Sequence, residues 1–206
     1  IKQGNKRFAM PSANYLWPQL LNKATKKVIE DNGGEVVLEE YFPLDQVEYS
    51  ATIGKIKSEK VDHVFLTIIP PGLGPFGKQL YESGWQNDGG TISCVYYDEN
   101  SPYYVEPYAL EGTYSCLDYF HTVDDPFSNK LLAEYNAMWD DKFLFTAGAA
   151  ATGMYRAIKL YEQGVIATNG DLKREAVSEA LDNISVANGP GGGYKTVPGT
   201  GHCAMN

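Results

Sequence analysis

The fold is decided by the segment Val61-Asp62-His63-Val64-Phe65-Leu66-Thr67-Ile68-Ile69, which is almost continuously apolar. Such a run is typical of a strand that is buried on both faces, as the strands of a parallel sheet are. The flanking segments have helical spacing instead. Ile53 and Ile56 lie on one face of a helix predicted over Tyr49–Ser58, and a second helix is predicted over Leu73–Ser83. The sequence therefore indicates a helix–strand–helix unit at this point.

The same alternation continues outward in both directions. Further strands are expected over Lys6–Pro11, Glu35–Phe42, Thr91–Tyr97 and Gly112–Phe120. A helix over Tyr15–Glu30 is indicated by the spacing of Leu16, Leu20, Leu21, Ala24 and Val28. Strands and helices that alternate with short loops build right-handed βαβ units and a parallel sheet flanked by helices. We therefore expect an α/β fold with a Rossmann-like lobe.

The pattern changes after Asp124, where helices follow one another without a strand between them. They are predicted over Pro126–Trp139, Thr146–Glu162 and Asp171–Leu181. The glycine-rich segment Gly189–Gly193 then connects to a short strand over Tyr194–Val197. A second body of structure is therefore expected to begin near Tyr119–Asp125.

The charge and the cysteines exclude several kinds of partner and site. The 206-residue chain has a formal net charge of −9, whereas nucleic-acid binding needs clustered Lys and Arg. Apolar runs fall well short of the roughly 18 residues that span a bilayer. Cys94, Cys116 and Cys203 are odd in number and form no C-x-x-C, which argues against a zinc site and a disulfide framework. We expect buried free thiols, with Cys94 and Cys116 in strand-like runs that can be neighbours in the sheet.

A ligand site in an open parallel sheet lies beyond the carboxyl ends of the strands. The loops that meet this condition are Pro11–Trp17, Ile69–Pro75 and Tyr97–Pro102. With their flanking residues they supply rigid aromatic side chains such as Tyr15 and Trp17, and carboxylates at Asp98 and Glu99. This combination suits a small solute with an apolar part and an amino or amide group. In the alternative interpretation, the two aromatic residues cap the helix beneath them.

The motif Gly72-Leu73-Gly74-Pro75-Phe76-Gly77 matches the G-x-G-x-x-G fingerprint of dinucleotide-binding proteins, with acidic residues roughly 20 positions further on. However, Pro75 stands where backbone N–H groups should meet the pyrophosphate, and the motif follows the third predicted strand instead of the first. An NAD(P)-dependent oxidoreductase is therefore the alternative function. The histidines have no Ser, Cys or carboxylate partner at an informative spacing. We expect no enzyme, no cofactor and no metal site.

Four stretches resemble the type I periplasmic solute-binding proteins of the branched-chain amino acid, amide and urea ABC transporter group. They are Pro11–Pro18 with its Ser-x-x-Tyr-x-Trp-Pro pattern, Gly34–Ile56, Val61–Leu80, and Glu111–Tyr135 with the small-residue helix that follows. The resemblance runs over nearly the whole chain in order. It implies that Tyr15 and Trp17 touch the ligand and that positions near Ile69 and Asp98, with Glu99 next to it, line the cleft.

The resemblance implies the substrate-binding component of an ABC transporter, which captures a small amino acid, amide or urea-like solute between two lobes. Its partners are then a small-molecule ligand and a membrane permease. Its location is the periplasm, or the extracellular side with a lipid anchor in a Gram-positive cell. Residues 1–122 and 190–206 are assigned to the second, C-terminal lobe, and residues 123–189 to a helical segment of the first, N-terminal lobe. A ligand-sensing regulatory domain of the same fold is a further alternative.

The resemblance also predicts that part of the family's structure lies outside this chain, because the first half of a family member is not matched. The helices after Asp124 would then expose apolar faces, which is uncommon in a soluble monomer. The residues on these faces are Leu131, Leu132, Tyr135, Met138, Ala150, Met154, Ala157, Ile158, Tyr161, Ala176 and Leu181. We expect them to pack against a missing N-terminal lobe or, in a homo-oligomer, against a second chain.

Overall fold

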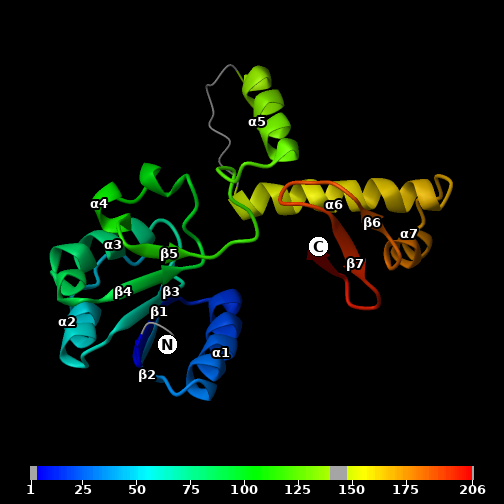
Figure 1. The fold of residues 1–206 in the computed structure, drawn as a ribbon. Helices are drawn as coiled ribbons and strands as arrows, with labels where there is room; N and C mark the ends of the chain where they lie inside the picture. The colour runs from blue at the N-terminus through cyan, green and yellow to red at the C-terminus, as the bar shows by residue number, and fades with distance from the viewer. Residues whose placement is uncertain (1–3, 140–147, 206) are drawn as a thin grey trace. The chain divides into compact units, whose positions relative to one another are not determined.

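The computed structural model describes residues 4–139 and 148–205 of the chain. The chain divides into two compact units, unit 1 over Ile1–Cys116 and unit 2 over Leu117–Asn206 (Figure 1). Unit 1 is built on a parallel sheet, and unit 2 on helices with a small antiparallel sheet. The expected α/β fold with a parallel sheet flanked by helices is therefore confirmed.

The sheet of unit 1 has the strand order β2-β1-β3-β4-β5. Its strands are β1 Arg7–Ala13, β2 Glu35–Phe42, β3 His63–Leu66, β4 Thr91–Cys94 and β5 Thr113–Ser115. Neighbouring strands are parallel throughout, with register pairs such as Val64–Ile92 between β3 and β4. Because β1, β3 and β4 are adjacent, the segments that follow these strands lie along one edge of the sheet.

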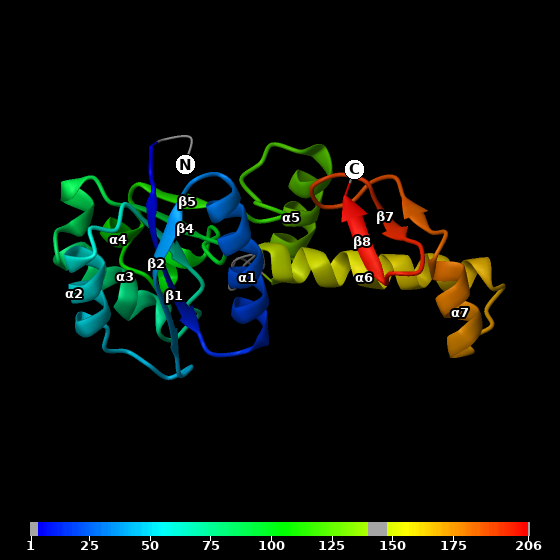
Figure 2. The ribbon, with the colours of Figure 1, turned by 90° about the horizontal axis from the view of Figure 1, so that it is seen from below.

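Helices cover both faces of this sheet. They are α1 Leu16–Asp31, α2 Ser50–Ser58, α3 Leu73–Glu82 and the short α4 Pro107–Leu110, with 3-10 turns at Trp85–Asp88 and Ser101–Tyr103. Helix α1 lies on one face, and α2 and α3 lie on the other (Figure 2). The main core forms between the sheet and α2 and α3, where Tyr49, Ile56 and Phe76 are almost completely buried.

The segment Val61–Ile69 is buried along most of its length, but the paired strand β3 is shorter than this run. Val61 and Ile68 belong to the core without belonging to the strand. The chain leaves the sheet before Pro70 and Pro71, which have no N–H to donate to a ladder. Continuous apolar sequence therefore indicates burial here more accurately than it indicates strand length. In the same way, β5 is shorter than the strand predicted over Gly112–Phe120.

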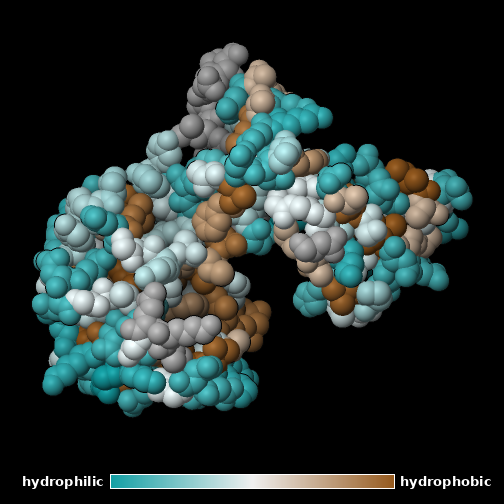
Figure 3. Space-filling model, in the orientation of Figure 1, coloured by the Kyte–Doolittle hydropathy of each residue, from teal (hydrophilic) through white to brown (hydrophobic). Residues whose placement is uncertain are grey.

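Helix α1 packs on the sheet with a different face from the one that its apolar spacing indicates. Its buried residues are Pro18, Asn22 and Ile29. In contrast, Leu16, Leu20 and Val28 are 68%, 59% and 59% exposed, and hydrophobic surface covers α1 in Figure 3. The period of the pattern predicts the helix correctly, but the apolar residues do not identify the side that meets the sheet.

Unit 2 begins with residues 117–125, which form neither helix nor strand, and contains α5 Pro126–Trp139, α6 Gly148–Ala167 and α7 Arg174–Leu181 in its described part. The predicted helix start at Thr146 lies outside the described residues. Helices α6 and α7 pack closely, because Gly164 leaves room for the side chains of Val177 and Leu181. The buried Arg156 of α6 donates to the carboxylate of Asp118 and to the carbonyl oxygen of Pro190.

The sheet of unit 2 joins β6 Ser185–Val186, β7 Tyr194–Val197 and β8 His202–Met205 in antiparallel order. The sequence predicts β7 correctly, whereas β6 and β8 are not predicted. Residues 190–206 thus fall in unit 2 by their contacts. The assignment of residues 1–122, 123–189 and 190–206 to the two lobes stays a prediction.

The cysteines are all free, but they differ in burial. Cys94 is buried on β4, as expected, and burial raises the pKa of its thiol to about 12. Cys116 and Cys203 are exposed, so the expectation of buried thiols is wrong for both. Cys94 pairs in register with Ser115, which places Cys116 just beyond the end of the β4–β5 ladder.

Candidate functional site

The candidate site is the edge of unit 1 where β1, β3 and β4 end. We define this carboxyl edge as residues 14–17, 67–72 and 95–104. The end of β1, just before the first segment, is joined to the second segment by backbone hydrogen bonds, from Ala13 N to Thr67 O at 3.2 Å and from Thr67 N to Pro11 O at 3.2 Å. The loops after β1 and β3 therefore start side by side, and the strand order puts the loop after β4 next to the loop after β3.

Tyr15 and Trp17 form a close aromatic pair at the start of α1. Their ring centroids are 6.1 Å apart with an angle of 31° between the ring planes. Burial, and secondly the neighbouring Tyr96, raise the pKa of the Tyr15 phenol. Tyr15 stands at the N-cap position, yet its side chain makes no capping hydrogen bond in the described part of the chain. Helix capping therefore does not account for this residue, and the partly exposed pair is accessible to a ligand.

Ile69 lies between the buried Ile68 and the turn at Pro70 and Pro71. Its side chain is half-buried, so it presents a small apolar surface at the carboxyl edge. The chain then enters α3 at Gly72, where a Cβ would overlap the hydroxyl oxygen of Tyr49. This close packing fixes the end of the β3 loop against α2.

Asp98 closes a local turn after β4. Its Oδ1 accepts a hydrogen bond from the backbone N–H of Asn100 at 2.9 Å, and its Oδ2 accepts one from Asn100 Nδ2 at 3.2 Å. The backbone N–H of Asp98 donates to Ser101 Oγ at 3.0 Å. A carboxylate has about four acceptor positions, so these bonds leave capacity for a donor on a ligand. Glu99 beside it is half-buried.

The tyrosines of the β4 loop divide into core and surface residues. Tyr97 is 5% exposed and belongs to the core, with its hydroxyl next to Gly77. Tyr96 and Tyr104 are 42% and 37% exposed and add aromatic surface to the edge. Burial raises the pKa of Tyr104 to about 12, and its hydroxyl lies 3.1 Å from Ser101 Oγ.

The glycines of the dinucleotide-like motif have packing roles. A Cβ at Gly72 would overlap Tyr49, and a Cβ at Gly74 would overlap the carbonyl oxygen of Tyr104. At Gly77 a Cβ would come within 3.3 Å of the Tyr97 hydroxyl. The backbone of Tyr104 thus occupies the space next to the start of α3 where a pyrophosphate would have to approach. Packing explains this motif without a dinucleotide.

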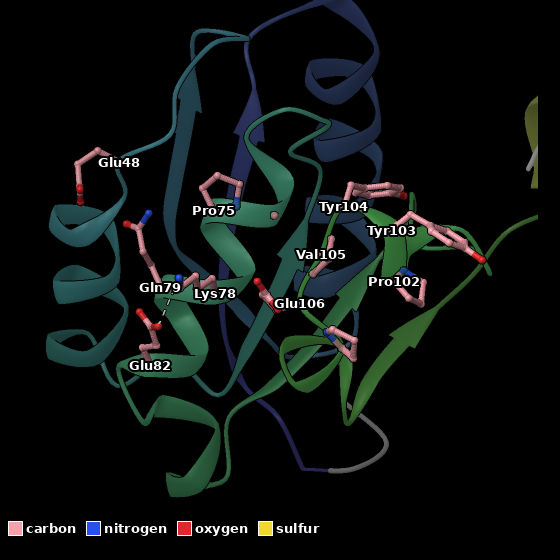
Figure 4. A pocket seen from close by; sticks show the side chains of 12 residues that line it. Glu48, Pro75, Lys78, Gln79, Glu82, Pro102, Tyr103, Tyr104, Val105 and Glu106 are labelled. Carbon is pink, nitrogen blue, oxygen red and sulfur yellow. Dashed lines mark ion pairs between the residues drawn. The ribbon is translucent and has the colours of Figure 1, made fainter.

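A cavity of about 580 Å³ lies on the α3 side of unit 1. Figure 4 shows Glu48, Gln79 and Glu82 on one side of it and Tyr103 and Tyr104 on the other. Gln79 is already bonded to the backbone, accepting from Tyr49 N and donating to Val47 O at 2.8 Å each. The five residues predicted from sequence do not line this cavity. It adjoins the carboxyl edge through the two tyrosines.

The sequence did not single out three buried polar residues at the carboxyl edge. Ser12, Asn22 and Thr67 are all 0% exposed and hydrogen-bonded to one another. The available signal in α1 was weak, because Asn22 is one of three uncharged polar residues in the helix, with Gln19 and Thr25. Within residues 4–139 and 148–205, no group of three or more His, Cys, Asp or Glu side chains is placed to hold a metal ion. In the same described ranges, no helix has the length and hydropathy to cross a membrane.

Comparison with known proteins gives a consistent result. The family model described as "Periplasmic binding protein" matches residues 1–206. No curated protein sequence matches the chain. A solute-binding protein of an ABC transporter from R. palustris, solved with 4-hydroxybenzoate, has a TM-score of 0.86 at 21% identity over 99% of this chain and 55% of its own.

Two further structures are similar over the same length. A second R. palustris solute-binding protein, solved with benzoate, has a TM-score of 0.84 at 22% identity over 100% of this chain and 55% of its own. A leucine-binding protein from Thermotoga maritima has a TM-score of 0.83 at 18% identity, over 99% and 56%. This chain therefore spans about half the length of these proteins, and at such identities the likeness shows the fold alone.

Proposed function

Because this chain belongs to the periplasmic binding protein family, we propose that it acts as part of the substrate-binding component of an ABC transporter. The observation that carries the proposal is the carboxyl edge of unit 1. There the aromatic pair Tyr15 and Trp17, the apolar Ile69 and the carboxylate of Asp98 lie on adjacent loops. Ligands of open parallel sheets bind at this edge.

The chemistry of the edge supports a solute with a donor group and an apolar part. The described segments 14–17, 67–72 and 95–104 contain no Lys or Arg, whereas they contain Asp98 and Glu99. An ammonium or amide group matches such an edge, because a carboxylate accepts strong hydrogen bonds from it. We therefore propose a small amino acid, amide or urea-like solute, whose donor end lies toward Asp98 or Glu99.

An aromatic acid is the second candidate, and the Tyr15–Trp17 pair favours it. Aromatic side chains with centroids 6.1 Å apart offer a surface on which another ring can pack. Two of the similar structures were solved with 4-hydroxybenzoate and benzoate. In that case the carboxylate of the solute would be held by residues outside the carboxyl edge.

A thermal-shift screen on the longest natural form of the protein tests the proposal. The panel is leucine, acetamide, urea and 4-hydroxybenzoate, with NADH for the alternative oxidoreductase. Binding of a solute to the folded state raises the melting temperature in a concentration-dependent way. A rise with a member of the solute panel and none with NADH is expected. A rise with NADH alone would contradict the proposal.

The remaining parts of the proposal follow from the family. The partners are a small solute and a membrane permease, the chain catalyses no reaction, and the location is periplasmic, or extracellular with a lipid anchor. The exposed apolar residues of unit 2, such as Met138, Met154 and Ile158, pack in this proposal against another lobe or a second chain. A sensing role is separated from transport by deleting the gene for this protein and measuring solute uptake, which a transport role predicts will be lost even when the permease is produced from an independent promoter.

A further inference from the structure

Three buried polar side chains lie where β1, α1 and the β3 segment meet at the carboxyl edge. Asn22 Nδ2 donates to Ser12 Oγ at 2.6 Å, and Thr67 Oγ1 donates to Ser12 Oγ at 2.8 Å. Thr67 Oγ1 is also 3.5 Å from Asn22 Oδ1, and Ser12 Oγ is 3.1 Å from the carbonyl oxygen of Met10. We call Ser12, Asn22 and Thr67 the edge triad. It links α1, β1 and the end of the β3 segment.

The position of the triad is unusual for polar groups. All three residues are 0% exposed, and a buried polar group is costly unless it is hydrogen-bonded. Apolar residues of similar size would fill the same space without that cost. However, they would lack the directional hydrogen bonds that set the relative positions of the three segments. Satisfied buried polar networks make a packing arrangement more rigid and more specific. The triad therefore restricts how α1, β1 and the β3 loop sit against one another.

The backbone explains why this place needs such a restriction. The ladder between β1 and β3 contains the pairs Phe8–His63 and Ala9–Val64, near the amino end of the sheet. Toward the carboxyl end these segments meet in the isolated bridge Ser12–Thr67. Side-chain bonds from the triad thus supplement a short ladder at the point where the two segments leave the sheet.

Each member of the triad lies a few residues from one that is proposed to contact the solute. Ser12 precedes Tyr15 by three positions, and Thr67 precedes Ile69 by two. Asn22 lies on α1, whose first turn carries Trp17. We propose that Asn22, acting through Ser12 and Thr67, is a positioning residue that sets the geometry of the Tyr15–Trp17 pair relative to Ile69. This inference rests on the proposed function and extends it to residues that do not touch the solute.

Fluorine NMR of the chain labelled with fluorotryptophan tests the inference without any solute. The resonance of Trp17 is assigned with Trp17→Phe and compared with those of Trp85 and Trp139. Variants Thr67→Val and Asn22→Leu remove bonds of the triad. Thr52→Val is the matched control: Thr52 is 4% exposed on α2, and its Oγ1 donates to Glu40 Oε2 at 2.7 Å.

We expect both triad variants to shift or broaden the Trp17 resonance and to leave that of Trp139 in place. Thr52→Val should lower the melting temperature without moving Trp17. If the triad variants lower the melting temperature as Thr52→Val does and leave Trp17 unmoved, the triad is structural and the inference is wrong. If Asn22→Leu fails to fold, Thr67→Val decides alone. A moved Trp17 resonance in a protein that binds none of the solute panel would contradict the proposed function and leave the positioning role standing.

Discussion

The backbone of Gly74 lies against the carbonyl oxygen of Tyr104, so that a Cβ at position 74 would overlap that oxygen. This contact holds the turn after β4 against the first turn of α3. It fixes Tyr103 and Tyr104 at the end of the carboxyl edge, and it explains why position 74 is a glycine without a bound dinucleotide. A glycine needed for close packing cannot be distinguished from a phosphate-binding glycine in the sequence. The structure distinguishes them, because it shows which atoms lie against the glycine.

The first prediction follows from this contact. Gly74→Ala should lower the stability of the protein by about 1–3 kcal/mol, because backbone atoms of Tyr104 have to move. Gly54→Ala is the matched control, since Gly54 lies within α2 with no atom in contact distance of a Cβ. That change should stabilise the protein by about 0.5–1 kcal/mol. Chemical denaturation measures both, and equal effects would contradict the packing role of Gly74.

The aromatic pair gives a prediction about affinity. Replacing Tyr15 or Trp17 by Ala in the protein that binds the solute should weaken binding by about 1–3 kcal/mol, because the pair forms a wall of the site. The melting temperature should change little, since Trp17 is 38% exposed. Tyr81→Ala provides a control with similar exposure (40%) away from the carboxyl edge. Calorimetric titration that finds unchanged affinity together with a large loss of stability would rule out the wall.

Asp98 closes a turn and is proposed to bind the solute, and a single substitution separates these two roles. Asp98→Asn keeps a side-chain oxygen that can accept from the backbone N–H of Asn100, so the turn should persist. It removes the negative charge that a donor group on the solute would meet. We expect weaker binding of solutes with an ammonium or amide group and only a small fall in melting temperature, because the bond from Asn100 Nδ2 is lost. Unchanged affinity for every solute that binds would show that Asp98 serves the turn alone.

The lowered pKa of His63 predicts that the stability of the protein falls at acidic pH. Burial lowers the pKa of its imidazole to about 4 from 6.5, and the neutral ring is held between Thr91 Oγ1 at 2.8 Å and Ser93 Oγ at 2.7 Å. The folded state therefore binds this proton less readily than the unfolded state does. The free energy of unfolding keeps the full contribution of the neutral His63 above pH 6.5 and loses it as the pH falls toward 4. The slope of the free energy of unfolding against pH approaches about 1.4 kcal/mol per pH unit in this range.

The matched variant is His63→Gln, which stays neutral across this range. Its free energy of unfolding should lack the part of the pH dependence between pH 6.5 and 4 that the native protein shows. Denaturant titrations at a series of pH values measure the difference. Parallel curves for the two proteins would mean that His63 does not titrate differently on folding.

The surface of unit 2 predicts association of the purified chain. Met154 and Ile158 of α6 are 63% and 58% exposed, next to Tyr161 at 50%. Exposed apolar faces of this kind are usually covered by another protein surface. Light scattering should detect self-association, and Ile158→Lys should reduce it. A well-behaved monomer that binds a solute with micromolar affinity would show that nothing further covers these helices.

Much of the fold was predictable, because alternating periods follow directly from burial on one or two faces. The parallel sheet could be anticipated from the βαβ alternation, and with it the position of the loops that carry Tyr15 and Asp98 at the same edge of the sheet. The side of α1 that packs on the sheet could not be predicted, because its buried face includes the polar Asn22 while Leu16 and Leu20 face outward. The strands β6 and β8 could not be predicted either. Both are short, and they form by pairing with β7 without a strand-like pattern in their own sequences.

The measurement that tests the central claim most directly is a solute titration followed by fluorine NMR of the fluorotryptophan-labelled protein. The solute is the member of the panel that raises the melting temperature most. Binding at the carboxyl edge predicts that the Trp17 resonance shifts in step with saturation, while those of Trp85 and Trp139 stay in place. A solute that binds by calorimetry and leaves Trp17 unmoved would contradict the account.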